Sequence, residues 1–263
     1  GAMAEIARRS IPRDFRSIDT RTARIILVEG EDRLLTAFPP ELSARAKRDL
    51  ERLGVEVRIN SRVTHVDDDG VRIGDERVNA ECVLWAAGVQ AEGLVRSLGV
   101  ELDRSGRVKV EPDLSVPGHP RVFIAGDLAA VSDPKTGQPV PGVAPAAMQM
   151  GRYVGRLIAR EAGRPDNAKK PGDRSPFRYV DKGLLATIGR AHAVADIRGL
   201  RLKGLLAWLL WAGVHIFFLI GFRNRLIVMM QWAWEYLLFQ RGARLITGDA
   251  HQARSISDQS MAR

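Results

Sequence analysis

The sequence predicts an α/β fold with a parallel sheet, and three observations support this prediction. Residues 23–30 (ARIILVEG) are a β-branched, apolar run typical of a buried parallel strand. Residues 40–53 place apolar side chains at helical spacing, and Gly54 is expected to end that helix. A second strand-like run begins at Val55. Strand, helix and strand in this order make a βαβ unit.

The segments around this unit complete the N-terminal part of the fold. Residues 1–9 are expected to form the end of a helix. Several short strands are expected over residues 55–88, joined by hairpin turns. The turns are expected at two pairs, Asp69-Gly70 and Gly74-Asp75. Cys82 lies in the apolar run ECVLWAAG, and we expect it to be a small core residue and not a nucleophile.

The C-terminal part alternates strands and helices. Residues 121–131 (RVFIAGDLAAV) predict a short strand that ends in Gly-Asp. Residues 146–162 predict a helix, with Pro145 well placed at its start. After a polar linker, residues 177–197 predict two further short strands, with their turn at Lys182-Gly183.

Composition and charge restrict the classes of function. One cysteine among 263 residues excludes an internal disulfide framework and is typical of a reducing compartment. The five histidines are scattered and no CxxC pair occurs, so we expect no metal site. The net charge is +9, and residues 198–248 hold seven basic residues, one acid and four of the five tryptophans. Basic residues that bracket apolar, tryptophan-rich runs favour an anionic membrane surface over nucleic acid.

Three local features carry candidate chemistry. Glu29 ends a strand of the βαβ unit, where an acid accepts hydrogen bonds from a dinucleotide ribose and disfavours a 2′-phosphate. The alternative is a solvated acid, because the glycine-rich loop that should precede it is not in this chain. Gly126 permits a turn that presents Asp127 to a ligand hydroxyl; the alternative is an Asx turn or a helix cap. The helix behind Pro145 directs its positive end toward an electron-accepting ring, or is an ordinary amphipathic helix.

The order of these motifs resembles a known family. AECVLWAAGV, then RVFIAGD, then APAAMQMG resemble the two-dinucleotide-binding-domain flavoproteins. With FRYVDKGLLATIGR and the apolar tail, residues 1–248 resemble the type II (alternative, non-proton-pumping) NADH:quinone oxidoreductases. The resemblance implies Rossmann-like NAD and FAD domains, here truncated, followed by a membrane-anchoring helical region. It also implies hydride transfer from NADH to FAD and two-electron reduction of a quinone in a respiratory chain.

The resemblance also implies site residues. Cofactor-binding roles fall on Glu29, Gly88, Gly126, Asp127, Ala144, Pro145, Gln149 and Lys182. Glu29 matches the ribose-binding acid of the NADH domain, and Gly88 matches the crossover back to the FAD domain. Gln149 and Lys182, near the flavin, are the implied catalytic residues. Many family members read A-Q-x-A-x-Q where this chain reads APAAMQ, so Pro145 replaces the first glutamine and leaves the quinone contact less defined.

The family pattern divides the chain into five parts. They are the C-terminal part of the NADH domain (1–88), the C-terminal part of the FAD domain (89–165), a small β segment closing the flavin site (166–200), anchoring helices (201–248) and a disordered tail (249–263). The pattern also implies that the chain starts inside the NADH domain, with both cofactor loops upstream. Those loops supply the N–H groups that hold pyrophosphates, so we expect this chain alone to bind neither cofactor tightly and to be inactive.

The implied partners are NADH, a membrane quinone and the bilayer surface, without nucleic acid. The implied assembly is a homodimer at the cytoplasmic face of a bacterial inner membrane. Residues 204–222 (GLLAWLLWAGVHIFFLIGF) are borderline in length for a spanning helix. With the amphipathic run that follows, we expect them to form a two-helix anchor in one leaflet, with His215 facing protein or headgroups.

Two other functions stay open. A sulfide:quinone oxidoreductase shares the fold, but that chemistry passes sulfur through a cysteine pair, and this chain has one cysteine. Glu29 also favours NADH as the electron donor. The third possibility is a non-catalytic, membrane-anchored remnant without cofactor loops.

Overall fold

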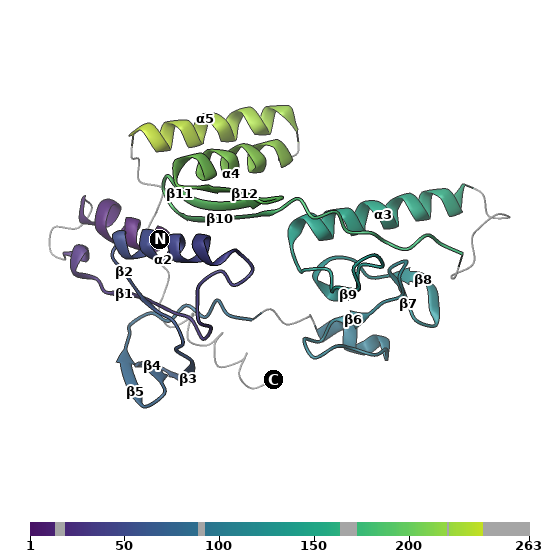
Figure 1. Cartoon of the computed structure of the whole chain (residues 1–263), viewed down its shortest axis with the longest axis horizontal. Coiled ribbons are helices and arrows are strands. Elements are labelled where there is room, and N and C mark those ends of the chain that lie inside the picture. The colour runs from purple at the N-terminus through teal and green to yellow at the C-terminus, as the bar shows by residue number, and fades with distance from the viewer. Residues whose placement is uncertain (14–18, 89–92, 164–172, 220, 239–263) are drawn as a thin grey trace, which may run out of the picture. The chain divides into compact units, whose positions relative to one another are not determined.

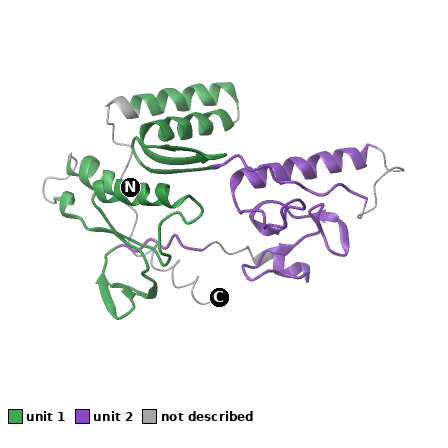
Figure 2. Ribbon diagram, viewed as in Figure 1, with its two compact units in different colours: residues 1–81, 184–263 green, residues 82–183 purple. Residues whose placement is uncertain are grey.

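A computed structural model describes residues 1–13, 19–88, 93–163, 173–219 and 221–238 (Figure 1). The chain divides into two compact units, one of residues 1–81 with 184–263 and the other of residues 82–183 (Figure 2). The boundary after Gly183 divides the range 166–200 that the family pattern groups together. The expected tail over 249–263 lies outside the described residues.

The first unit contains the expected βαβ arrangement. β1 (Ile25–Val28) and β2 (Val55–Arg58) pair in parallel, and α2 (Pro40–Arg52) connects them. The helix ends where Gly54 adopts a φ of +83°, as its sequence predicts. The expectation that this first strand is buried was wrong. β1 is only half-buried, and Leu27 is 38% exposed.

The first unit also contains an N-terminal helical segment and a small antiparallel sheet. The N-terminal turns α1 (Ala2–Glu5) and η1 (Ile6–Ser10) confirm a helical start, and short 3-10 turns follow at η2 (Ile11–Arg13) and η3 (Thr20–Thr22). Ala4 packs in a cluster with Ala46, Leu50, Val55 and Ile188. The strands β3 (Val63–Asp67), β4 (Gly70–Ile73) and β5 (Glu76–Asn79) form an antiparallel sheet. The turn at Gly74-Asp75 is as expected, and the other lies at Asp68-Asp69, one residue before its expected position, because Gly70 already pairs with Asp67 in the sheet.

A second three-stranded sheet of the first unit lies between two helices (Figure 1). It is antiparallel and comprises β10 (Leu184–Gly189), β11 (His192–Ile197) and β12 (Leu200–Lys203). Successive side chains of a strand alternate between its faces. Val194 therefore packs with Leu42 of α2, whereas Ala193 and Ala195 pack with Ala207 of α4 (Leu205–Phe218).

The outermost helix, α5 (Phe222–Leu238), lies against α4 (Figure 1). The rings of Trp211 and Trp232 stack between these helices at 5.5 Å. No helix within the described ranges combines the length and apolar character needed to cross a membrane.

The second unit is built around α3 (Ala144–Ala162), which begins two residues before its expected start. Short parallel strands β6 (Val108–Lys109) and β9 (Ala129–Ala130), the antiparallel pair β7 (Ser115–Val116) and β8 (His119–Phe123), and the 3-10 turns η4 (Gly93–Leu98) and η5 (Gly126–Leu128) complete it. The core comprises Leu114, Ala129, Val131, Val140, Ala146, Met150 and Phe177.

Three expectations about local structure were wrong. The run 121–131 is not one strand, because Gly126 with a φ of +78° turns the chain between β8 and β9. The hairpin turn expected at Lys182-Gly183 lies at Arg190-Ala191, since residues 177–183 form no strand. Cys82 is exposed, as is Trp85 at 63%, because no strand in the described part of the chain pairs with residues 82–88.

Candidate functional site

In the first unit, Glu29 directly follows β1. Its backbone N–H donates to the carbonyl of Arg58 at 2.8 Å, which ties it to the parallel neighbour strand. Its Oε1 accepts the backbone N–H of Glu31 at 3.0 Å, and its Oε2 makes no hydrogen bond to another described residue. A Cβ added to Gly30 would meet nothing within 4 Å apart from its chain neighbours, so the position directly after Glu29 is open. Oε2 can therefore accept a hydrogen bond from a ribose hydroxyl.

In the second unit, Gly126 and Asp127 turn against the first turns of α3. A Cβ on Gly126 would lie 3.4 Å from Cβ of Ala147, and its N–H donates to Sδ of Met150 at 3.2 Å. The Asp127 side chain is exposed and makes no hydrogen bond within the described residues, so it forms neither an Asx turn nor a helix cap. It remains an acceptor for an incoming hydroxyl.

The start of α3 is open to an anion. Val143 precedes the helix without a side-chain cap, Ala144 is exposed, and Pro145 occupies the first turn as expected. The positive end of a helix of this length favours negative charge. Gly88 has a φ of +79° and is exposed, in keeping with a chain crossover.

The amide of Gln149 is engaged at both ends. Its Nε2 donates to the carbonyl of Val180 at 3.0 Å, and its Oε1 accepts the N–H of Val180 at 2.9 Å. Asp133 Oδ2 accepts the N–H of Tyr179 at 3.2 Å. Lys182 is exposed two residues beyond Val180. Gln149 therefore holds the segment that carries Lys182, and a direct bond to a ligand would compete with this pairing.

Replacing Gln149 by glutamate should destabilise the second unit. The carboxylate cannot donate to the Val180 carbonyl, which then faces an oxygen, and a lost hydrogen bond costs about 1–2 kcal/mol. Thermal or urea unfolding measures this loss. Gln138→Glu is the matched control, because Gln138 is exposed and should change little. Equal stability of the two variants would contradict the positioning role.

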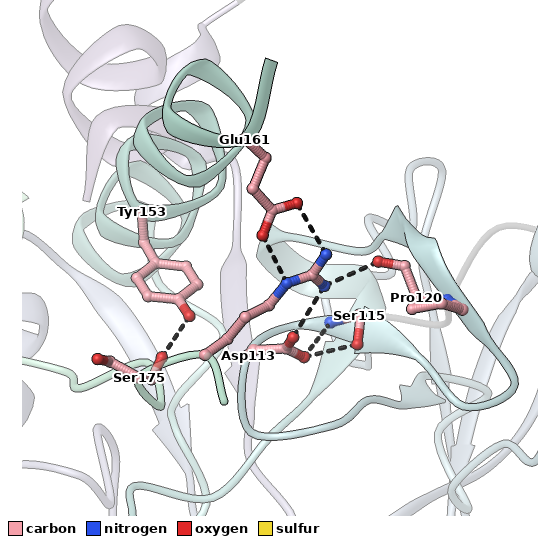
Figure 3. Close-up of polar contacts among 7 residues, drawn as sticks. Asp113, Ser115, Pro120, Tyr153, Glu161 and Ser175 are labelled. Carbon is pink, nitrogen blue, oxygen red and sulfur yellow. Dashed lines mark hydrogen bonds and ion pairs between the residues drawn. The ribbon is translucent and has the colours of Figure 1, made fainter. Parts of the chain in front are cut away.

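A buried ionic network, which the sequence did not indicate, lies at the other end of α3 (Figure 3). Arg174 donates from Nε and Nη2 to the two oxygens of Glu161 at 2.8 and 2.9 Å. Its Nη1 donates to Asp113 Oδ2 at 3.0 Å and to the Pro120 carbonyl at 2.8 Å. Asp113 Oδ1 accepts from the Ser115 hydroxyl at 2.6 Å. Arg174 lies in a polar stretch without periodicity, so no local signal could have identified it.

The environment of this network explains its pKa values. Burial raises the pKa of Asp113, but the hydrogen bonds from Ser115 and Arg174 lower it by more than burial raises it. The pKa of Asp113 therefore lies below its ordinary value. Burial lowers the pKa of Arg174, and its bonds to Glu161 and Asp113 more than offset this. Asp113 and Arg174 are therefore both charged at neutral pH. No group of three or more potential metal ligands occurs among the described residues.

Two family models match the chain. The pyridine nucleotide-disulphide oxidoreductase model matches residues 13–151, and the NDH2 C-terminal domain model matches residues 182–241. The chain is 39% identical over 98% of its length to "Type II NADH:quinone oxidoreductase Ndh" of Mycobacterium tuberculosis. It is 29% identical over 71% of its length to the type II NADH:quinone oxidoreductase of Staphylococcus haemolyticus. It spans 56% and 46% of these relatives, so about half of their length.

A solved structure shares the fold. NDH2 from Plasmodium falciparum in complex with NADH superposes with a TM-score of 0.76 at 17% identity. The similarity covers 89% of this chain and 62% of that one. The α/β architecture expected from the sequence is thereby confirmed.

Proposed function

This chain belongs to the pyridine nucleotide-disulphide oxidoreductases and, among them, to the type II NADH:quinone oxidoreductase family, and from this membership we propose its activity. It takes part in oxidising NADH through FAD and in reducing a quinone by two electrons, without pumping protons. Bound FAD would supply the hydride acceptor and the electron carrier. The geometry of Glu29 carries the proposal: its half-buried carboxylate follows a parallel strand, has one oxygen without a partner among the described residues, and precedes the open position at Gly30.

Five of the candidate residues have a role in this activity that their surroundings support. Glu29 accepts hydrogen bonds from the NADH ribose and repels a 2′-phosphate. Asp127 accepts a hydroxyl of FAD, and the positive end of α3 at Ala144 stabilises negative charge on the flavin side. Lys182 lies on the segment that Gln149 holds in place.

Membrane contact through α4 and α5 is the second part of the proposal. Both helices expose large apolar side chains, with Phe217 of α4 at 66% and Phe222 of α5 at 80%. Exposed Arg201, Lys203 and Arg223 accompany this surface. Such a surface fits the headgroup boundary of one leaflet, at the cytoplasmic face of a bacterial inner membrane, with the enzyme as a homodimer. His215, whose Nδ1 lies 2.8 Å from the Trp211 carbonyl, then meets protein and headgroups.

Turnover assays test the activity. The protein expressed from its complete gene and loaded with FAD should oxidise NADH when a soluble ubiquinone analogue is present. Sulfide in place of NADH should give no quinone reduction. Sulfide-driven reduction, or NADH oxidation that does not depend on the quinone, would overturn the proposal.

Membrane contact gives a separate prediction. Met230→Glu combined with Trp234→Glu should weaken binding to phosphatidylglycerol vesicles at least about tenfold, because apolar area is lost and like charge is added. Vesicle flotation measures the bound fraction. Val66→Glu, at an exposed apolar position on β3, is the control and should bind as the parent does. Vesicle binding that is lost equally in both proteins would argue against α5 as the contact surface.

A further inference from the structure

A basic hollow lies on the second unit, between α3 and residues 174–178. Its volume is about 1250 Å³. Five arginines line it: Arg152, Arg156, Arg160, Arg174 and Arg178. Glu161 is the one acid among the lining residues, so the lining carries a formal charge of +4, from five arginines less one glutamate.

Four of these arginines form no hydrogen bond or ion pair that would stabilise the described part of the fold. Arg174 is neutralised by Glu161 and Asp113. Arg152, Arg156, Arg160 and Arg178 are exposed and make no hydrogen bond or ion pair with any described residue. Like charges spaced four residues apart on a helix repel one another. Three arginines at this spacing therefore cost stability in the absence of an anion.

The walls of the hollow are held together before any ligand arrives. Arg174 bonds to both oxygens of Glu161 on α3, and the Tyr153 hydroxyl donates to the Ser175 carbonyl (Figure 3). Gln149 adds its paired bonds to Val180 at the far end. A ligand that enters this hollow does not have to order the backbone on either side, which reduces the free-energy cost of binding.

We propose that this hollow binds a small ligand that carries a polyphosphate group. A guanidinium group can donate two parallel hydrogen bonds to two oxygens of one phosphate, which makes it more specific for phosphate than an ammonium group. Arg152 to Arg160 span eight residues of helix, about 12 Å, which suits a chain of phosphates better than one ion. The rings of Tyr153 and Phe177, 5.8 Å apart, add an aromatic wall. The test of this site is independent of the proposed oxidoreductase activity, because it measures binding alone.

Titration with inorganic triphosphate tests the proposal. Calorimetry of the full chain at fixed ionic strength should show saturable binding of one triphosphate. Arg156→Gln combined with Arg160→Gln should weaken the affinity at least about tenfold, since charged hydrogen bonds are lost. Arg96→Gln combined with Arg104→Gln removes the same charge from exposed positions of the same unit outside the hollow, and should leave the affinity within about twofold.

Three results would overturn the proposal. One is the absence of saturable heat when triphosphate is titrated into the parent protein. Another is an equal loss of affinity in the two double variants, which indicates net charge alone. The last is binding of phosphatidylglycerol vesicles, but not of triphosphate, that depends on Arg156 and Arg160, because the ligand would then be a lipid headgroup.

Discussion

Replacing Arg174 by alanine should lower the free energy of unfolding of the second unit by about 3–5 kcal/mol, the cost of leaving buried charges unpaired. The side chain of Arg174 is 4% exposed and bonds to Glu161, Asp113 and the Pro120 carbonyl. Alanine removes every one of these bonds and leaves the Asp113 carboxylate, itself nearly buried, without its cation. Lysine should recover only part of the loss, because an ammonium group cannot bridge both oxygens of Glu161 as a guanidinium does.

Urea unfolding of Arg174→Ala and Arg178→Ala measures this difference. The two arginines lie four residues apart, but Arg178 is exposed and unpaired within the described residues, so its loss should change stability by about 0.5 kcal/mol or less. A similar cost for both variants would contradict the network as a source of stability.

The pH dependence gives an independent check on the same network. The pKa of Asp113 in the folded state lies below its unfolded value of about 3.9. A carboxyl group with a lowered folded pKa contributes stability above its unfolded pKa, and this stability is lost as pH falls through the folded pKa. The parent should therefore lose stability steeply below about pH 4. Arg174→Ala should lose less over that range, because the ionised form has already lost its partner. Equal acid slopes would argue against this assignment.

Replacing Glu29 by alanine should lower kcat/KM for NADH by about 10- to 100-fold, mainly through KM. A charged acceptor contributes about 1.5–3 kcal/mol to its hydrogen bonds with a ribose. Its remaining oxygen and the open space beside Gly30 support this contact. Glu29→Gln keeps the shape but removes the charge, so the ratio of NADPH to NADH turnover should rise because 2′-phosphate repulsion is relieved.

Steady-state kinetics on the complete, FAD-loaded protein tests this prediction. Glu81→Ala removes an exposed acid from the same unit and should leave KM for NADH unchanged. An unchanged KM in Glu29→Ala would remove Glu29 from the nucleotide site. A kcat that falls while KM stays constant would point to an indirect effect on folding or on electron transfer.

Apolar periodicity and helix-start signals predicted the helices and strands whose formation depends on residues close by in the sequence. The βαβ unit follows from apolar spacing over 23–58, and α3 from its periodicity and Pro145. The exposed run around Cys82 was mispredicted, because apolar composition indicates burial only where a neighbouring strand is available. The hairpin turn was displaced for a related reason: residues 177–183 satisfy their backbone through side chains such as Gln149 and Asp133 and do not form a ladder.

The sequence by itself determined the class of fold, the order of the motifs, the family and the surplus of basic and aromatic residues near the C-terminus. These properties depend on residue type and spacing along the chain. Only the tertiary structure decided which side chains meet. Arg174 and Asp113 are 61 residues apart in the chain, and Glu5 and Arg190 are 185 apart. Such contacts arise when helices and strands pack, and spacing carries no information about them. For the same reason, the role of Gln149 as a backbone clamp and the arginine-lined hollow became visible only in three dimensions.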